Sequence, residues 1–416
     1  MTDDERELAR YQAALLEVLA GAEQPEQALR ELHERAEFAP FAGYVGSFEP
    51  RCVEVGMRLV KQWGGRCGGQ GAEPGLSGRD AVTMKAAVLG AVGGVFEQRD
   101  LPIPEPGPGQ VRLRVHASGL CGTDVHIWRG DYPVPLPIVL GHEPAGTVDQ
   151  VGPGVTRLVE GDRVGVCWAQ AGCGRCVACE RDAIKYCPEQ RSWIHNGGGH
   201  SEWMIAEATG CARLPDGLAW EEAAPIFCAG FTVMSGYRNA RPRAGDRVAV
   251  LGIGGLGHLA VQIAKAFGHE VIAVTATEGK RREAKDLGAD EVLVMRHHVG
   301  EELAAMGGAD VILATSSSME ASSRALAGLR PGGRFVSMGL GEGALTIDPM
   351  QLLSQQITIV GSMQNDREDL IDALDLVARG RVKPRLEVYP MQLVNQAMSR
   401  LVEGRVRYRA VLLHEA

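Results

Sequence analysis

Hydrophobic and polar positions follow three successive patterns along the chain. In the first pattern, apolar residues such as Leu15 and Leu19 recur at helical spacing, which predicts a small helical module over residues 1–63. Glycine then becomes frequent over residues 64–83, a composition typical of a flexible linker. A new domain is therefore expected to begin at about Met84.

The second pattern consists of short β-like runs separated by glycine and proline turns. Residues 85–89, 111–115 and 138–140 are such runs, and residues 84–236 show no long helical pattern between them. This segment predicts a mostly antiparallel β domain.

The third pattern, over residues 237–374, alternates strands with helices. A predicted strand at 247–251 is followed by a glycine loop, a helix that carries Val261 and Ala264, and a second strand at 270–274. Further β-like runs extend this βαβ unit into a doubly wound parallel sheet of the Rossmann type. They cover residues 292–295, 311–314, 334–338 and 357–360. The predicted fold class is α/β, with a β-rich domain, a Rossmann domain and a small N-terminal helical module.

Length, charge and composition narrow the class of protein. A chain of 416 residues exceeds what one core usually supports, which agrees with two large domains. The net charge of -9 argues against a nucleic-acid partner. No apolar run approaches the roughly 20 residues that span a bilayer, and the start of the chain is acidic, unlike a targeting peptide. We therefore expect a cytoplasmic protein without a membrane contact.

Four of the ten cysteines lie close together, at the spacing Cys173-x2-Cys176-x2-Cys179-x7-Cys187. In a cytosolic chain such a cluster favours metal binding over disulfides. Four thiolates complete the tetrahedral shell of zinc and leave no position for water, which predicts a structural site whose binding energy contributes to folding. The alternatives are an iron–sulfur cluster and chance clustering.

A second set of metal ligands is dispersed along the chain. Cys121 and His142 lie on separate predicted loops and offer a thiolate and an imidazole, both suited to zinc. Cys228 is the best candidate for a third ligand, and two cysteines with one histidine would leave a fourth position for water or an alcohol oxygen. Taken one at a time, such residues are more often part of a packed core, but the set as a whole is harder to explain in that way.

The glycine loop Gly252-Ile253-Gly254-Gly255-Leu256-Gly257 lies between a predicted strand and a predicted helix. That context indicates a dinucleotide site, because glycines let a pyrophosphate approach the N-terminus of the helix closely.

The segment after the second strand bears on the choice between NAD and NADP. Thr275 occupies the position where NAD-binding domains of this kind place Asp or Glu. Thr277 offers a hydroxyl, and Lys280, Arg281 and Arg282 offer positive charges, for a 2′-phosphate, which favours NADP. The alternative is that the basic residues only begin the next helix as a solvated face, and Glu278 weakens their field.

Five segments, together with the four-cysteine spacing, resemble the zinc-containing medium-chain alcohol dehydrogenases. They are CGTDVH, GDYP, GHEPAGTV, VGPGV and GDRVGV. The motif sequences are most similar to those of the yeast-type and bacterial enzymes, and the resemblance covers residues 84 to about 413. It implies a GroES-like catalytic domain over 84–236, completed by about 375–416, and a Rossmann domain over 237–374.

The resemblance also implies roles for individual residues of the dispersed set. Cys121, His142 and Cys228 would ligate a catalytic zinc, and Glu143 would lie behind the metal as an alternate ligand. Asp124 would orient His142 from outside the metal shell.

Further residues are assigned on the same ground. Thr123 and His126 would form a proton relay from the buried site through the cofactor ribose to water. Arg409 resembles the arginine that contacts the pyrophosphate. Tyr132 and Trp168 fall where bulky aromatic residues narrow the pocket for small primary alcohols, although core filling is the common role of such residues.

The predicted function is oxidation of primary alcohols or reduction of aldehydes, with two zinc ions per chain and NAD(P), in a homodimer or homotetramer. NADP is favoured because the segment after Thr275 is similar to NADP-using cinnamyl-alcohol-type relatives. A polyol or amino-alcohol dehydrogenase is the second interpretation, because CGTD also occurs in sorbitol- and threonine-type relatives. A third interpretation gives residues 1–63 the role of docking the enzyme to a protein partner.

Overall fold

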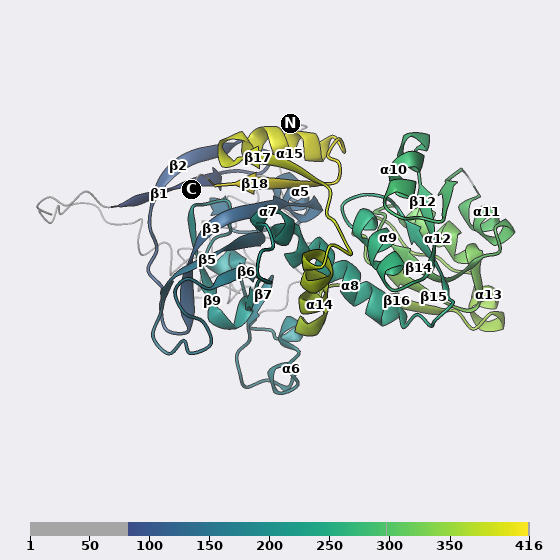
Figure 1. Ribbon diagram of the computed structural model, residues 1–416, viewed down its shortest axis with the longest axis horizontal. Helices are drawn as coiled ribbons and strands as arrows, with labels where there is room; N and C mark the ends of the chain where they lie inside the picture. The colour runs from purple at the N-terminus through teal and green to yellow at the C-terminus, as the bar shows by residue number, and fades with distance from the viewer. Residues whose placement is uncertain (1–81, 297, 415–416) are drawn as a thin grey trace, which may run out of the picture. The chain divides into compact units, whose positions relative to one another are not determined.

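The structure, a computed structural model, describes residues 82–296 and 298–414 (Figure 1). The helical module predicted for residues 1–63 and nearly all of the linker predicted for residues 64–83 lie outside these ranges. Within the described ranges, no helix is both long and apolar enough to cross a membrane.

The first part of the described chain forms mostly antiparallel sheets, as predicted. The largest has the strand order β10-β6-β5-β3-β18-β17, with β9 also paired to β3, and a smaller sheet has the order β2-β1-β4. Val111, Leu113 and Val115 alternate along β3 and pack in one buried cluster with residues of β5, β6 and β9. The strands are β1 (Thr83–Leu89), β2 (Phe96–Pro102), β3 (Gln110–Leu120), β4 (Ile138–Val139), β5 (Glu143–Val151), β6 (Arg163–Val166), β7 (Ala169–Ala171), β8 (Arg191–Ser192), β9 (Trp203–Glu207), β10 (Cys211–Arg213), β17 (Leu386–Pro390) and β18 (Arg409–Leu413). The helices beside them are α5 (Gly122–Arg129), α6 (Val177–Glu180), α7 (Trp220–Ala223) and α15 (Val394–Val402).

The end of the chain returns to this sheet. β18 pairs with β3 in antiparallel orientation, with Ala410 opposite Leu120. It pairs with β17 in parallel, which departs from the antiparallel pattern predicted for this domain. The pairing places Arg409 beside the end of β3, where Cys121 follows.

The third sequence pattern forms a six-stranded parallel sheet with the order β13-β12-β11-β14-β15-β16. All six predicted strands are present, and only β15 begins well before its predicted start. The strands are β11 (Arg247–Leu251), β12 (Glu270–Thr275), β13 (Glu291–Val294), β14 (Ala309–Ala314), β15 (Leu329–Ser337) and β16 (Thr358–Gly361). The helices are α8 (Ala229–Ala240), α9 (Gly257–Ala266), α10 (Arg281–Asp286), α11 (Val299–Ala305), α12 (Met319–Ala325), α13 (Pro349–Ser354) and α14 (Arg367–Ala378).

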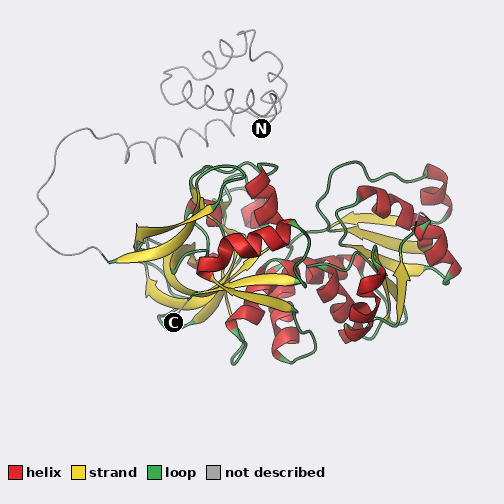
Figure 2. Ribbon diagram, turned by 90° about the horizontal axis from the view of Figure 1, so that it is seen from above, coloured by secondary structure: helices red, strands yellow, loops and turns green. Residues whose placement is uncertain are grey.

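Helices cover both faces of this sheet (Figure 2). Val248 and Val250 of β11 belong to a buried cluster with residues of α8, α9 and α14, whereas Ala249 and Leu251 belong to a second cluster with residues of α11 and α12. Since side chains on both faces of β11 are buried, the strand is a continuous apolar run instead of an alternating one.

His258 lies in the first turn of α9 and is fully buried. Its ring stacks on Tyr408 at a centroid distance of 5.0 Å. Its Nε2 accepts the Arg385 backbone N–H at 3.3 Å, and its Nδ1 lies 3.1 Å from the Gly254 carbonyl oxygen, so the neutral ring uses both nitrogens. Burial, followed by the charge of Arg409, lowers the pKa of His258 to about 3.

Acidification should therefore destabilise the folded chain through His258. An unfolded histidine has a pKa near 6.5, so below that pH the unfolded chain binds a proton that the folded chain excludes until about pH 3. At pH 5 the resulting loss of unfolding free energy is about 2 kcal/mol. We expect His258→Gln to reduce the difference in unfolding free energy between pH 7.5 and pH 5 by this amount, measured with denaturant. His298→Gln, at an exposed position, is the control, and an equal pH dependence in both variants would contradict the prediction.

Candidate active site and metal sites

Four metal-binding side chains from three separate segments meet at the end of β3. Cys121 caps the N-terminus of α5, His142 directly precedes β5, and Cys228 precedes α8. The ligand atoms of these three residues and of Glu143 all lie within 4.8 Å of one another. Cys121 Sγ is 3.1 Å from His142 Nε2 and 3.9 Å from Cys228 Sγ. The structure thus brings the dispersed set together.

The electrostatics of this group suit a thiolate ligand. Burial opposes ionisation of Cys121, but its hydrogen bond with Cys228 and the charge of His142 outweigh burial and hold the pKa of this thiol well below its usual value. The hydrogen bond with Cys121, followed by burial, raises the pKa of Cys228. The Thr123 backbone N–H also donates to Cys121 Sγ at 3.2 Å. Two sulfurs, an imidazole nitrogen and a carboxylate are a donor set that fits zinc.

Asp124 faces the ring nitrogen of His142 that points away from Cys121. Its Oδ1 lies 3.4 Å from His142 Nδ1, and its Oδ2 accepts the Cys121 backbone N–H at 2.8 Å. Both side chains are buried. The carboxylate lies on the side of the ring opposite Nε2, where a residue that orients the imidazole is expected.

Glu143 points to the other side of the group and is balanced by Arg409. The Arg409 guanidinium donates to Glu143 Oε1, and both residues are buried. Burial raises the pKa of Glu143 to about 7, although Arg409 counteracts it. Glu143 Oε2 has no hydrogen-bond partner within the described residues, which fits an atom available to a metal. A Cβ atom at Gly119 would lie 1.9 Å from this oxygen, so the carboxylate needs a glycine beside it.

Thr123 and His126 lie one turn apart on α5, on neighbouring positions of its surface. Thr123 is half-buried beside Cys121, whereas the His126 side chain is 34% exposed and its Nδ1 lies 3.0 Å from Asp131 Oδ2. The helix therefore leads from the buried thiolate to water.

Three aromatic residues, Tyr132, Trp168 and Trp193, form an aromatic group beside the metal-binding side chains. The ring centroid of Trp168 is 5.3 Å from that of His142 and 6.1 Å from that of Tyr132. Trp193 is 5.7 Å from Trp168 and is fully buried. The sequence predicts positions for Tyr132 and Trp168 but leaves Trp193 unassigned, because its only signal is a large side chain shortly after the four-cysteine run.

The sulfurs of Cys173, Cys176, Cys179 and Cys187 also lie within 4.8 Å of one another. None of the four forms a disulfide. The short elements between them, α6 and a 3-10 turn at Ile184–Tyr186, contain no buried residue. An apolar core therefore does not hold this lobe together, and a four-sulfur donor set that fits zinc is the interaction available to do so.

The glycine loop connects β11 to α9, as predicted. Gly252 has a φ of +93°, a backbone conformation that favours glycine. A Cβ atom at Gly257 would lie 1.8 Å from the Gly252 carbonyl oxygen, whereas a Cβ atom at Gly254 would meet nothing within 4 Å. At Gly255 a Cβ atom would lie 2.9 Å from Arg409 Nη1, so the arginine that pairs with the carboxylate behind the metal ligands also contacts this loop. Leu256 caps α9.

Of the residues predicted to hold a 2′-phosphate, Thr275, Lys280 and Arg281 are buried or engaged in other contacts, whereas Thr277 and Arg282 are exposed. Thr275 is buried, with 2% of its surface exposed. Lys280 Nζ donates to the Ile253 carbonyl oxygen in the glycine loop at 2.6 Å. The Arg281 guanidinium donates to both carboxylate oxygens of Glu278. The hydrogen bond of Lys280 therefore stabilises the glycine loop, and the charge of Arg281 is neutralised by Glu278.

Comparison with known proteins agrees with this geometry. The family described as the alcohol dehydrogenase GroES-like domain matches residues 107–216, and the family described as zinc-binding dehydrogenase matches residues 255–379. An alcohol dehydrogenase of Geobacillus stearothermophilus is 38% identical over 334 residues, which cover 79% of this chain and 99% of that protein.

Solved structures are similar as well. The acetophenone reductase of Geotrichum candidum, in complex with NAD, has a TM-score of 0.71 and 30% identity, and the match covers 81% of this chain and 98% of that one. A zinc-binding dehydrogenase from Sinorhizobium meliloti bound to NADP has a TM-score of 0.72 and 28% identity, covering 80% of this chain and 99% of that one.

Gly119→Ala should displace the Glu143 carboxylate, because the new methyl group would overlap Oε2. We expect a loss of unfolding free energy of about 1–3 kcal/mol, the range for overpacking a buried site. Gly122→Ala is the matched control, since a Cβ atom there meets nothing within 4 Å. Denaturant unfolding of the two variants measures the difference, and equal stability would show that Glu143 does not lie against Gly119.

Proposed function

This chain belongs to the zinc-containing medium-chain alcohol dehydrogenases, and we propose on this basis which role each of its residues has in the reaction. The protein is an oxidoreductase that interconverts alcohols and aldehydes with zinc and a nicotinamide cofactor. The polyol or amino-alcohol interpretation is not favoured, because the curated relatives that match are alcohol dehydrogenases. The observation that carries the proposal is the group formed by Cys121, His142, Glu143 and Cys228.

We propose two zinc ions per chain. Cys121, His142 and Cys228 hold the catalytic ion, with Glu143 as an alternate ligand and Asp124 as the residue that orients His142. The four-cysteine lobe holds the structural ion. Zinc at the first site would supply a Lewis acid for the substrate hydroxyl, and the nicotinamide cofactor would supply the hydride acceptor.

The chain's own residues move the proton and shape the pocket. We assign the uptake of the proton to the Thr123 hydroxyl, and its delivery to water to His126, which lies one turn further along α5 and is partly exposed. Trp168 and Tyr132 narrow the space beside His142. Small primary alcohols and aldehydes are therefore the proposed substrates.

The proposed cofactor is NADP. The glycine loop and Arg409 would hold the pyrophosphate, because the loop offers backbone N–H groups and the arginine contacts it at Gly255. Thr275 supports NADP over NAD, since the end of β12 lacks the carboxylate that would accept the ribose hydroxyls and repel a 2′-phosphate.

Two further proposals concern the organisation of the chain. Residues 84–236 with 375–416 are the proposed catalytic domain, and residues 237–374 are the proposed cofactor domain. The proposals of a cytoplasmic location and of a docking role for residues 1–63 rest on the sequence.

The free edge of the parallel sheet supports a homodimer. β16 is the last strand in the sheet order, and its outer edge is unpaired within the described residues. Ile359 of β16 is 36% exposed. An exposed edge strand with an apolar side chain is a template for pairing with another strand, and a second copy related by a twofold axis presents the same edge.

Ile359→Lys should prevent this association, because a charge would be buried between the two edges. Ile371→Lys is the matched control, since Ile371 is exposed on α14, away from the sheet edge. Light scattering during size exclusion should give the wild type and the control twice the chain mass of 44.5 kDa, and Ile359→Lys the mass of one chain. If the Ile359→Lys variant were dimeric, the dimer interface would have to lie elsewhere than at the edge of β16.

The two proposed zinc sites are separable by substitution. Cys121→Ser should abolish turnover and lower the zinc content from two ions to one while the fold is kept, because this site rests on packed strands. Cys179→Ser should lose the other ion and unfold first, because its lobe has no core. Zinc analysis and turnover on small, aromatic and polyhydroxy alcohols with NAD and NADP measure these effects. A wild type that holds both ions and oxidises none of these alcohols would contradict the proposed function.

A further inference from the structure

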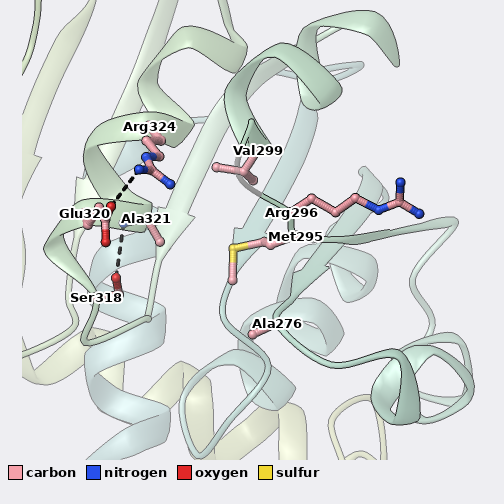
Figure 3. Close-up of a pocket in the computed structure, with 8 residues that line it drawn as sticks. All are labelled: Ala276, Met295, Arg296, Val299, Ser318, Glu320, Ala321 and Arg324. Carbon is pink, nitrogen blue, oxygen red and sulfur yellow. Dashed lines mark hydrogen bonds and ion pairs between the residues drawn. The ribbon is translucent and has the colours of Figure 1, made fainter.

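A cavity of about 540 Å³ opens at the carboxyl ends of the parallel strands (Figure 3). Parallel sheets of this type bind their cofactors outside these strand ends. Met295, Val299 and Ala321 give the cavity an apolar lining. Glu320 and Arg324 also line it and pair with each other at 2.7 Å. Such a cavity suits an adenosine group, but none of these features distinguishes NADP from NAD.

Two of the three cations predicted to bind a 2′-phosphate, Lys280 and Arg281, already form other contacts, whereas Arg282 is exposed. Lys280 is half-buried, donates to the glycine loop, and lies 5.6 Å from the centroid of the Tyr408 ring. Arg281 donates to Glu278 and, at 3.0 Å, to the Val292 carbonyl oxygen. Recruiting either cation to a phosphate would require breaking these contacts.

Arg296 and Arg324 are the two cations among the residues that line the cavity, and the sequence motifs do not identify Arg296. It follows β13, the neighbour of β12, and the Met295 backbone N–H donates to the Thr275 carbonyl oxygen at 2.7 Å. Arg296 therefore lies alongside Ala276, the residue after β12. Its side chain is exposed, and within the described residues it forms no hydrogen bond or ion pair. In Figure 3 it extends away from Ser318 and Glu320, whereas the Met295 side chain turns toward them.

We propose that Arg296 is the specificity-determining residue that binds the 2′-phosphate of NADP. Arginine donates to phosphate through two parallel N–H groups, and an uncommitted exposed side chain has to break no other contact to do so. Glu278 opposes this binding, since its charge already acts on that of Arg296. The inference rests on the proposed preference for NADP and adds the residue that produces it.

The test measures binding of two fragments, 2′,5′-ADP and 5′-AMP, to the full chain by calorimetry. These fragments differ only in the 2′-phosphate, so turnover is not involved. Arg296→Gln should weaken 2′,5′-ADP at least about ten-fold, as expected for a charge-assisted hydrogen bond, and leave 5′-AMP within about two-fold.

Arg282→Gln is the matched control, since it removes an equal exposed charge from the neighbouring helix. A loss of 2′,5′-ADP binding in this variant as large as in Arg296→Gln would overturn the inference in favour of a diffuse field. A wild type that binds both fragments equally would overturn the NADP preference together with Arg296. A wild type that prefers 2′,5′-ADP, with the preference kept in Arg296→Gln, would overturn the role of Arg296 alone.

Discussion

The buried ion pair between Arg409 and Glu143 joins the metal-binding side chains to the cofactor loop. Both charges are removed from water, and each is tolerable only because the other is present, so removing one partner of such a pair typically costs about 3–5 kcal/mol. Arg409 comes from the last strand of the chain, Glu143 from β5, and Gly255 from the loop that begins α9. The pair therefore makes the active site depend on segments that lie far apart in sequence. Gly119 completes the arrangement by leaving room for the carboxylate.

The two sets of metal ligands are supported in opposite ways. Cys121 and His142 adjoin β3 and β5, whose buried side chains pack in apolar clusters, so tertiary packing supports their positions. The four-cysteine lobe has short elements without a buried residue, and its sulfurs are the groups that hold it together. In the proposed two-zinc arrangement, the metal would complete a packed site in one case and contribute folding energy to a segment in the other.

The cofactor end of the Rossmann sheet shows that a basic residue has to be judged by its contacts. Lys280, Arg281 and Arg296 all lie near the carboxyl ends of β12 and β13, yet Lys280 braces the glycine loop and Arg281 is paired with Glu278. Positive charge in a motif is therefore not the same as positive charge available to a ligand. Arg296, whose side chain is exposed, follows β13, the strand next to β12, whereas the dinucleotide-binding motif concerns the segment after β12.

The sequence by itself determined the features that depend on local pattern and on spacing. The strands of the parallel sheet, the glycine loop and the four-cysteine lobe follow from period, glycine geometry and ligand spacing, which act over a few residues. Resemblance to a known family supplied the grouping of Cys121, His142 and Cys228. Only the tertiary structure decided the parallel pairing of β17 with β18, the place of Trp193 beside His142, and the hydrogen bonds that occupy Lys280 and Arg281. These features depend on contacts between residues far apart in the chain, and no local pattern records which distant partner a side chain meets.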